Sequence, residues 1–199
     1  MRLTIFFDCA NVSLGQTKGI KWMDFIQSQK NMVESYVGGA TGALASGVIW
    51  FIAGVVGIYL QPMHSMITLF IGGMLIFPLS MLLSKVFGHS GKHASDNVLG
   101  KLAVESLGIL FAGLFIAFVV AQFNSALFYP IMLLAIGARY LVFQTLYGLR
   151  TYWVLGGLLM LSGFLSAALS LPFIAGAFIG GGIEVAFSIL IYYQSNTIK

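Results

Sequence analysis

The sequence predicts an all-α membrane protein, and two features of its 199 residues support this fold class. Hydrophobic residues make up 59% of the chain and charged residues only 8%, against roughly 25% charged residues in an ordinary soluble domain. The apolar residues also form continuous stretches of about 20 residues, the length that a helix needs to cross the hydrocarbon core. Strands of a membrane barrel would instead alternate in polarity over about ten residues. The composition therefore excludes a soluble globular domain, a disordered chain and a nucleic-acid-binding protein.

Six stretches have this length, and each ends at polar or turn-forming residues. We expect a bundle of six transmembrane helices in which short exterior turns join successive helices into three helical hairpins. The expected spans are 37–60, 65–87, 99–123, 127–148, 152–171 and 173–193. The remaining segments are an N-terminal extension at 1–20, a candidate helix at 21–36 and a C-terminal tail at 194–199.

The candidate helix at 21–36 carries apolar residues at three- and four-residue steps. These residues are Trp22, Phe25, Ile26, Met32, Val33 and Tyr36. Charged residues stand between them, so the segment predicts an amphipathic helix that lies along the membrane interface. The alternative is an ordinary extension that leads into the first span.

The positive charges predict the orientation of the bundle. All ten Lys and Arg residues except Arg139 lie before the first span, around the second connection, in the fourth connection or at the C-terminus. In a chain of six spans these regions share one side, and the connections on the opposite side contain no Lys or Arg. By the positive-inside rule, both termini are cytoplasmic. We expect the protein in a bacterial cytoplasmic membrane.

Small residues recur at four-residue spacing along three of the spans. Examples are Gly38 with Gly42, Gly108 with Ala112 and Gly176 with Gly180. Small residues let helix backbones approach each other in lipid. The lipid bilayer is the expected partner, and these Gly/Ala-rich faces would serve either close packing of one bundle or a homo-oligomer.

Two charged residues lie deep within predicted spans, Arg139 in the fourth and Glu184 in the sixth. Both stand about nine residues, or roughly 13 Å, from the cytoplasmic ends of spans that run in the same direction. We therefore expect that they can form an ion pair. Glu105 lies shallower and stands one turn after Lys101, so it can pair on its own helix.

The Arg139 and Glu184 pair has two interpretations. Because ionisable groups in a membrane are costly, they indicate a site for an ion or a proton-linked solute. Alternatively, they form a static pair that sets the register of two helices. Gln144 and Ser188 supply polar atoms in the same half of the bilayer, and Pro78 should bend or open the second span. The candidate binding residues are therefore Arg139, Glu184, Glu105, Gln144, Ser188 and Pro78.

His89, His93 and Asp96 form a weak metal-site candidate in the second connection. Gly88 and Gly91 interrupt any helix that would align these side chains, and solvated loop residues are the simpler interpretation. The chain has no phosphate-binding loop, no zinc-protease helix and no serine-hydrolase elbow. No cofactor is expected, and an enzymatic activity is less favoured than a non-enzymatic role.

Two stretches resemble a known family. They are the segment from Gly72 to Ser80 with Lys85 after it, and the segment from Gly137 to Tyr140 with Leu146 and Tyr147 after it. They are similar to an uncharacterised bacterial family of multi-span membrane proteins of about 200 residues, defined only as a domain of unknown function. The likeness in layout covers 33–193 and leaves out the first twenty residues. It implies the membrane class and no mechanism.

These observations favour a small-solute or ion transporter, similar to a permease, with a site near Arg139 and Glu184. A second hypothesis is a scaffold or sensory membrane protein in which these charges are a structural pair. A third is a membrane-embedded enzyme that acts on lipid, with polar residues around 89–96 at the headgroup level.

Overall fold

The computed structural model describes residues 23–197, and the secondary structure in that range is entirely helical. The elements are α1 (Phe25–Tyr36), η1 (Val37–Gly39), α2 (Ala40–Tyr59), α3 (Pro62–Val86), α4 (Leu99–Glu105), α5 (Leu107–Ala121), η2 (Ser125–Leu127), α6 (Phe128–Tyr147), α7 (Thr151–Ala168) and α8 (Ala175–Thr197). Six helical stretches are long and apolar enough to cross a membrane. The predicted all-α class and number of spans are confirmed, whereas the extension at 1–20 and Trp22 lie outside the described residues.

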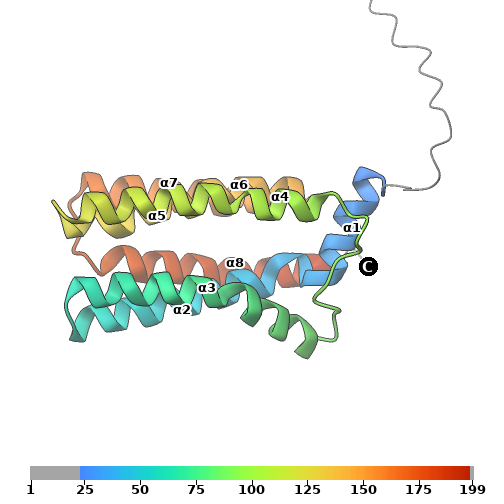
Figure 1. Ribbon diagram of the computed structural model, residues 1–199, viewed down its shortest axis with the longest axis horizontal. Helices are drawn as coiled ribbons and strands as arrows, with labels where there is room; N and C mark the ends of the chain where they lie inside the picture. The colour runs from blue at the N-terminus through green and yellow to red at the C-terminus, as the bar shows by residue number, and fades with distance from the viewer. Residues whose placement is uncertain (1–22, 198–199) are drawn as a thin grey trace, which may run out of the picture.

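The long helices form two groups that run side by side (Figure 1). In one group α2 packs along both α3 and α8, and in the other α6 packs along α5 and α7. Contacts between α7 and α8 join the two groups. The largest fully buried side chains include Trp50, Phe128, Tyr129 and Tyr152. The core therefore lies among α2, α6, α7 and α8, while most of the surface of α3 and α5 is left outside it.

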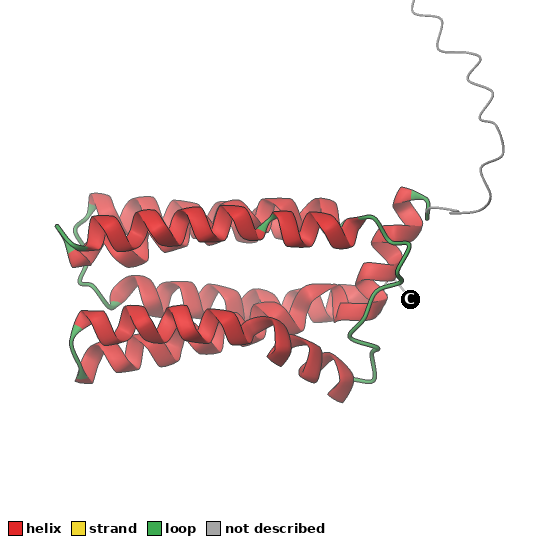
Figure 2. Cartoon of the chain, viewed as in Figure 1, coloured by secondary structure: helices red, strands yellow, loops and turns green. Residues whose placement is uncertain are grey.

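Two of the spanning helices are irregular. Pro78 lies inside α3, and Figure 1 shows that α3 changes direction in its second half and diverges from the bundle. Proline has no backbone N–H and its ring collides with the preceding turn, so a bend is expected there. The expected third span comprises α4 and α5, which meet at Ser106 (Figure 2). The Ser106 backbone stays close to helical there (φ −62°, ψ −18°), and its N–H donates to the carbonyl oxygen of Leu102 (2.9 Å).

The last helix is longer than its apolar stretch. It begins at Ala175 and continues to Thr197, so most of the segment expected as a tail is helical. The preceding helix ends at Ala168, and a short turn leads from it into α8.

Helix α1 lies across one end of the bundle, the end at which α8 also ends (Figure 1). Hydrogen bonds hold it to its neighbours: Gln29 Nε2 donates to the carbonyl oxygen of Thr145 (2.7 Å), and Asn97 Nδ2 donates to that of Ser28 (2.9 Å). On its apolar face Met32 and Val33 are buried in the protein, whereas Phe25 and Ile26 near its start are exposed. Helix α1 and the connection after α3 thus form one layer over this end of the bundle.

Close contact between α2 and α8 depends on glycine. A Cβ added at Gly181 would lie 2.9 Å from the carbonyl oxygen of Gly47 and 3.1 Å from the ring of Phe51. A Cβ at the next residue, Gly182, would meet nothing within 4 Å. Backbone atoms cannot move aside as a flexible side chain can, so α8 would have to shift away from α2.

We expect Gly181→Ala to lower the free energy of unfolding by about 1–3 kcal/mol relative to Gly182→Ala. Both substitutions gain the same helix propensity, about 1 kcal/mol, so the comparison isolates the contact between α2 and α8. Thermal unfolding of the two variants in the same detergent measures the difference. Equal stabilities would contradict the close approach of the two helices.

Candidate functional site

Glu184 lies on α8 and is fully buried, with 0% of its surface exposed. It follows Gly181 by one turn, so the close approach of α2 and α8 at Gly47 helps to enclose it. The facing side chains come from α2 and α6. This carboxyl group is therefore sealed inside the part of the bundle that would stand within the membrane.

Tyr140 on α6 is the direct partner of this carboxyl group. Its hydroxyl donates a hydrogen bond of 2.9 Å to Glu184 Oε1. The Tyr140 ring stacks on Tyr152 of α7 with ring centroids 5.8 Å apart, and the Tyr152 hydroxyl donates to the carbonyl oxygen of Gly38 (2.7 Å). Buried tyrosines thus extend from Glu184 to the turn between α1 and α2.

The second carboxyl oxygen of Glu184 lacks a partner. Oε2 is buried and has no hydrogen bond in the part of the chain that the structure describes. Ser46 of α2 faces the carboxyl group but does not make a hydrogen bond of normal geometry to this oxygen. An unpartnered oxygen on a buried ionisable group is costly, so the group is suited to hold a proton or a cation.

Arg139 is next to Tyr140 on α6 and is partly buried. Its Nε donates a hydrogen bond of 3.3 Å to Ser106 Oγ, and its guanidinium carbon lies 5.0 Å from the centroid of the Phe143 ring. The first contact joins α6 to the residue at which α4 and α5 meet. The second is a cation–π contact within α6, which partly compensates for the loss of water around the charge.

The expected ion pair between Arg139 and Glu184 is not formed. Among residues 23–197 the structure has one ion pair, Lys30 with Glu34 on the exposed side of α1 (3.9 Å). Because Tyr140 follows Arg139 directly and bonds Glu184, the two charged residues do lie at the same level of the bundle. Successive side chains of a helix point about 100° apart. When Tyr140 points towards Glu184, Arg139 therefore points away from it, towards Ser106.

The other predicted residues are less closely tied to this site. Glu105 is exposed on α4 and forms no ion pair with Lys101, contrary to expectation. Gln144 is partly buried on α6, one turn beyond Arg139 and Tyr140, and no side-chain hydrogen bond links it to either of them. Pro78 is exposed on α3. The structure thus brings together only Arg139 and Glu184 of this group, through Tyr140.

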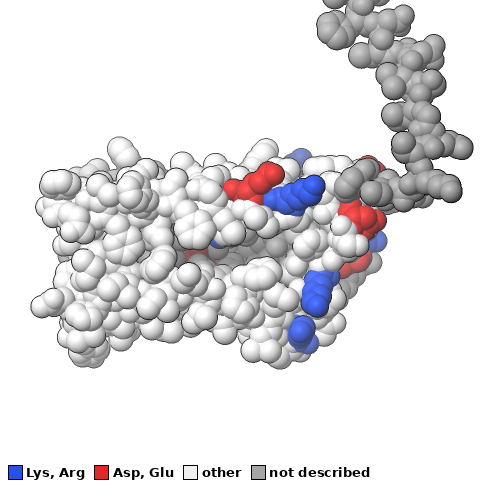
Figure 3. Space-filling view, viewed as in Figure 1, with Lys and Arg blue, Asp and Glu red and all other residues white. Residues whose placement is uncertain are grey.

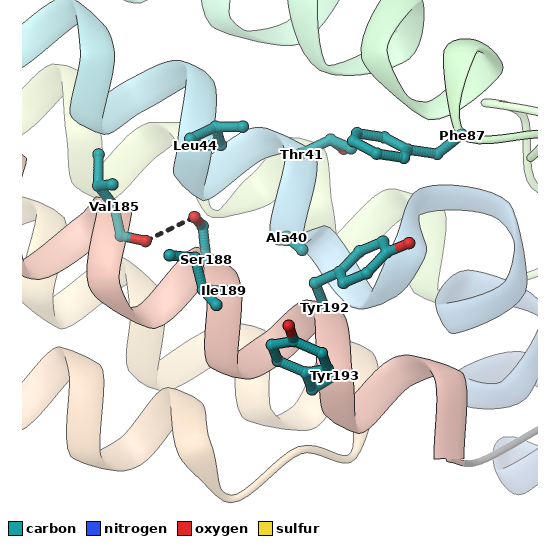
Figure 4. Close-up of a pocket in the computed structure, with 9 residues that line it drawn as sticks. All are labelled: Ala40, Thr41, Leu44, Phe87, Val185, Ser188, Ile189, Tyr192 and Tyr193. Carbon is teal, nitrogen blue, oxygen red and sulfur yellow. Dashed lines mark hydrogen bonds between the residues drawn. The ribbon is translucent and has the colours of Figure 1, made fainter.

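Ser188 lines a separate pocket of about 270 Å³ between α2, α8 and the end of α3. Figure 4 shows its hydroxyl turned back onto α8, where it donates to the carbonyl oxygen of Val185 (2.7 Å). Apolar and aromatic side chains form most of the wall, with Phe87, Tyr192 and Tyr193 at one end (Figure 4). Glu184 does not line this pocket, so Ser188 and Glu184 belong to different sites.

The candidate metal ligands instead tie the segment between α3 and α4 to α1 by hydrogen bonds. His89 Nδ1 is hydrogen-bonded to the carbonyl oxygen of Glu34 (2.5 Å), and His93 Nδ1 is hydrogen-bonded to the Tyr36 hydroxyl (2.9 Å). Asp96 is partly exposed nearby in the same connection. No three His, Cys, Asp or Glu side chains of residues 23–197 are grouped so that they could hold a metal ion.

Comparison with protein families agrees with the resemblance found in the sequence. The model of a family of unknown function, DUF7010, matches residues 25–194. The chain belongs to the DUF7010 family. The match begins with α1 and ends within α8, so it takes in every span and both charged residues. No curated protein and no solved structure matches the chain.

In this DUF7010 protein, sequence reasoning missed Tyr140, Ser106 and Ser46 as neighbours of the two charges. A weak indication for Tyr140 was present in the sequence, since a tyrosine next to an arginine within a span supplies a second polar group at the same depth. Ser106 carried none, because a serine within a long apolar stretch does not by itself mark the end of a helix.

Proposed function

We propose that this DUF7010 protein is a transporter of a small solute or ion, and that Glu184 holds the proton or cation coupled to transport. The observation that carries the proposal is the Glu184 carboxyl group, fully buried with one oxygen bonded to Tyr140 and the other unpartnered. A carboxylate that only fixed two helices together would be expected to have a cationic partner. Ionisable groups inside membranes commonly mark ion and proton pathways.

The arrangement in the membrane follows from the charges. We infer that α1 lies at the cytoplasmic interface, that both termini are cytoplasmic, and that the six spans form three hairpins in a bacterial cytoplasmic membrane. Figure 3 supports this orientation: its Lys and Arg atoms gather towards the α1 end of the bundle, and the opposite end has none on this face. Lys85, Lys92, Lys101 and Arg150 all belong to elements or connections at the α1 end.

Flux into proteoliposomes tests the proposal. The purified protein is reconstituted with the pH-sensitive dye pyranine inside, and a panel of small ionic solutes is added outside under an inward proton gradient and, separately, a sodium gradient. We expect at least one solute to change the rate of internal acidification relative to protein-free liposomes. Glu184→Gln should abolish that change, because the amide keeps the shape of the side chain and cannot exchange a proton.

Glu105→Gln is the matched control, because Glu105 is an exposed carboxylate on α4. It should keep the flux of the wild-type protein. Equal flux in Glu184→Gln and wild type would contradict the role of Glu184. A folded wild-type protein with no flux for any solute and either gradient would favour the structural role instead.

A further inference from the structure

The positive charge of Arg139 lacks a compensating negative charge in contact with it. No carboxylate of residues 23–197 forms an ion pair with it, and its contacts are the Ser106 hydroxyl and the Phe143 ring. A guanidinium group has five N–H donors, and only Nε is hydrogen-bonded. An arginine at membrane depth is costly unless its charge and donors are satisfied.

The free donors of Arg139 are accessible. Arg139 is only partly buried, and its terminal nitrogens are not among the sealed, unpartnered polar atoms of the described chain. Figure 3 shows a recess between the two groups of helices, with a few Lys or Arg and Asp or Glu atoms on its floor. The Arg139 guanidinium group is therefore not sealed from outside, unlike the Glu184 carboxyl group at the same level.

Arg139 contacts the neighbouring helix where α4 and α5 meet, at Ser106. The green segment within the upper helix of Figure 2 marks this junction, at which the Ser106 backbone keeps helical angles (φ −62°, ψ −18°). Ser106 Oγ accepts from Arg139 Nε and donates to the carbonyl oxygen of Ala103 (2.7 Å). It thereby fixes one edge of the guanidinium plane and leaves the other edge for a ligand.

We propose that Arg139 binds an oxyanion, a carboxylate or phosphoryl group, through its free guanidinium edge. The planar guanidinium group matches the two oxygens of such a ligand and can bind both at once. That the oxyanion is the transported solute rests on the function proposed above. Binding of the oxyanion at Arg139 can be measured without any flux.

Protonation of Glu184 should strengthen binding of the anion at Arg139. An ionised Glu184 places a negative charge at the same level of the bundle and opposes a second anion, whereas the neutral form does not. The groups that face the two residues are uncharged tyrosines: Tyr140 and Tyr147 on α6, and Tyr152 on α7 beyond them. Helices α2, α5 and α7 contain no charged residue, and α3 has His64 and Lys85 only near its ends. Lys101 and Glu105 are exposed on α4.

Ligand-dependent thermal stability tests the proposal on the full chain in an uncharged detergent. The melting temperature is followed against sodium acetate and sodium phosphate, with sodium chloride at matched ionic strength as reference. A second arm replaces the salts with phosphatidylglycerol or phosphatidylcholine in the micelles. We expect saturable stabilisation by at least one oxyanion; stabilisation by phosphatidylglycerol alone would assign the same site to a lipid headgroup.

The variants decide whether Arg139 is the site. Arg139→Gln should weaken binding by roughly tenfold or more, since a charge-assisted bidentate contact is lost. Arg139→Lys keeps the charge without the planar fork and should bind with intermediate affinity, which gives a second measure if the Gln variant does not fold. Arg150→Gln, at an exposed arginine before α7, is the control and should bind as the wild type does.

The pH dependence of anion affinity tests whether protonation of Glu184 affects binding at Arg139. Glu184→Gln imitates the neutral carboxyl group and should bind the anion at least as tightly as wild type, with an affinity that stays constant from about pH 5 to about pH 9. Wild-type affinity should fall as the pH rises. Equal stabilisation of wild type and Arg139→Gln by every anion would overturn the proposal. Oxyanion binding without any flux would keep this site and reject the transport function.

Discussion

Substitution of Tyr140 by Phe together with Glu184 by Met is expected to leave the protein at least as stable as wild type, although each single substitution destabilises it. Tyr140→Phe removes a direct hydrogen-bond donor of a fully buried carboxyl group, at a cost of about 1–3 kcal/mol. Glu184→Met leaves the Tyr140 hydroxyl without its acceptor, at a similar cost. The double variant removes both polar groups and fills the same volume with apolar atoms.

Thermal unfolding of the four proteins in one detergent gives the coupling between the two positions. Tyr193→Phe and Glu105→Met are the matched controls, because both side chains are exposed and the same chemical changes there should have little effect on stability. A double variant less stable than either single variant would contradict the expectation and support a structural role for the carboxyl group. A stable double variant without transport would show that the group is retained at a cost in stability, as is common for functional sites.

The second large effect is expected at the turn between α1 and α2. Gly39 has a φ of +86°, and a Cβ there would lie 2.3 Å from Tyr152 Oη and 2.8 Å from the Tyr147 ring. Gly39→Ala would displace the hydroxyl that donates to the carbonyl oxygen of Gly38 and disturb the stacked tyrosines behind it. We expect a loss of about 3 kcal/mol or more in the free energy of unfolding, from backbone strain and collision together.

Gly88→Ala separates these two causes. Gly88 has a similar φ of +79°, but a Cβ there would meet nothing within 4 Å. Its substitution should cost only the strain of a left-handed residue, about 1–2 kcal/mol. Chemical or thermal unfolding of both variants measures the difference. Equal losses would mean that the contact of Gly39 with Tyr152 contributes nothing to stability.

The sequence was sufficient for features that depend on local composition. The cost of placing polar groups in hydrocarbon acts on each stretch of chain separately, so apolar length predicts the spans without knowledge of their packing. The bend at Pro78 follows from the covalent structure of one residue. The depth of Arg139 and Glu184 follows from counting residues along helices of constant rise.

Contacts between helices were predicted less well. The sequence suggested that Arg139 meets Glu184, but the structure places Tyr140 against Glu184 and Arg139 against Ser106. The sequence also offered His89 and His93 as a weak metal-site candidate and favoured solvated loop residues, whereas both histidines are hydrogen-bonded to α1. In each case the residues lie at the expected level along the bundle, but they contact a different partner from the one predicted.

The sequence by itself determined the membrane class, the six spans and the level at which a buried acid and a partly buried arginine stand. Only the tertiary structure decided that Tyr140, and not Arg139, faces Glu184. Depth is set by position along one helix, whereas a contact also depends on how each helix is rotated about its axis. That rotation is set by packing, here by the approach of α8 to α2 at Gly181 and Gly47, and it leaves Arg139 turned towards Ser106.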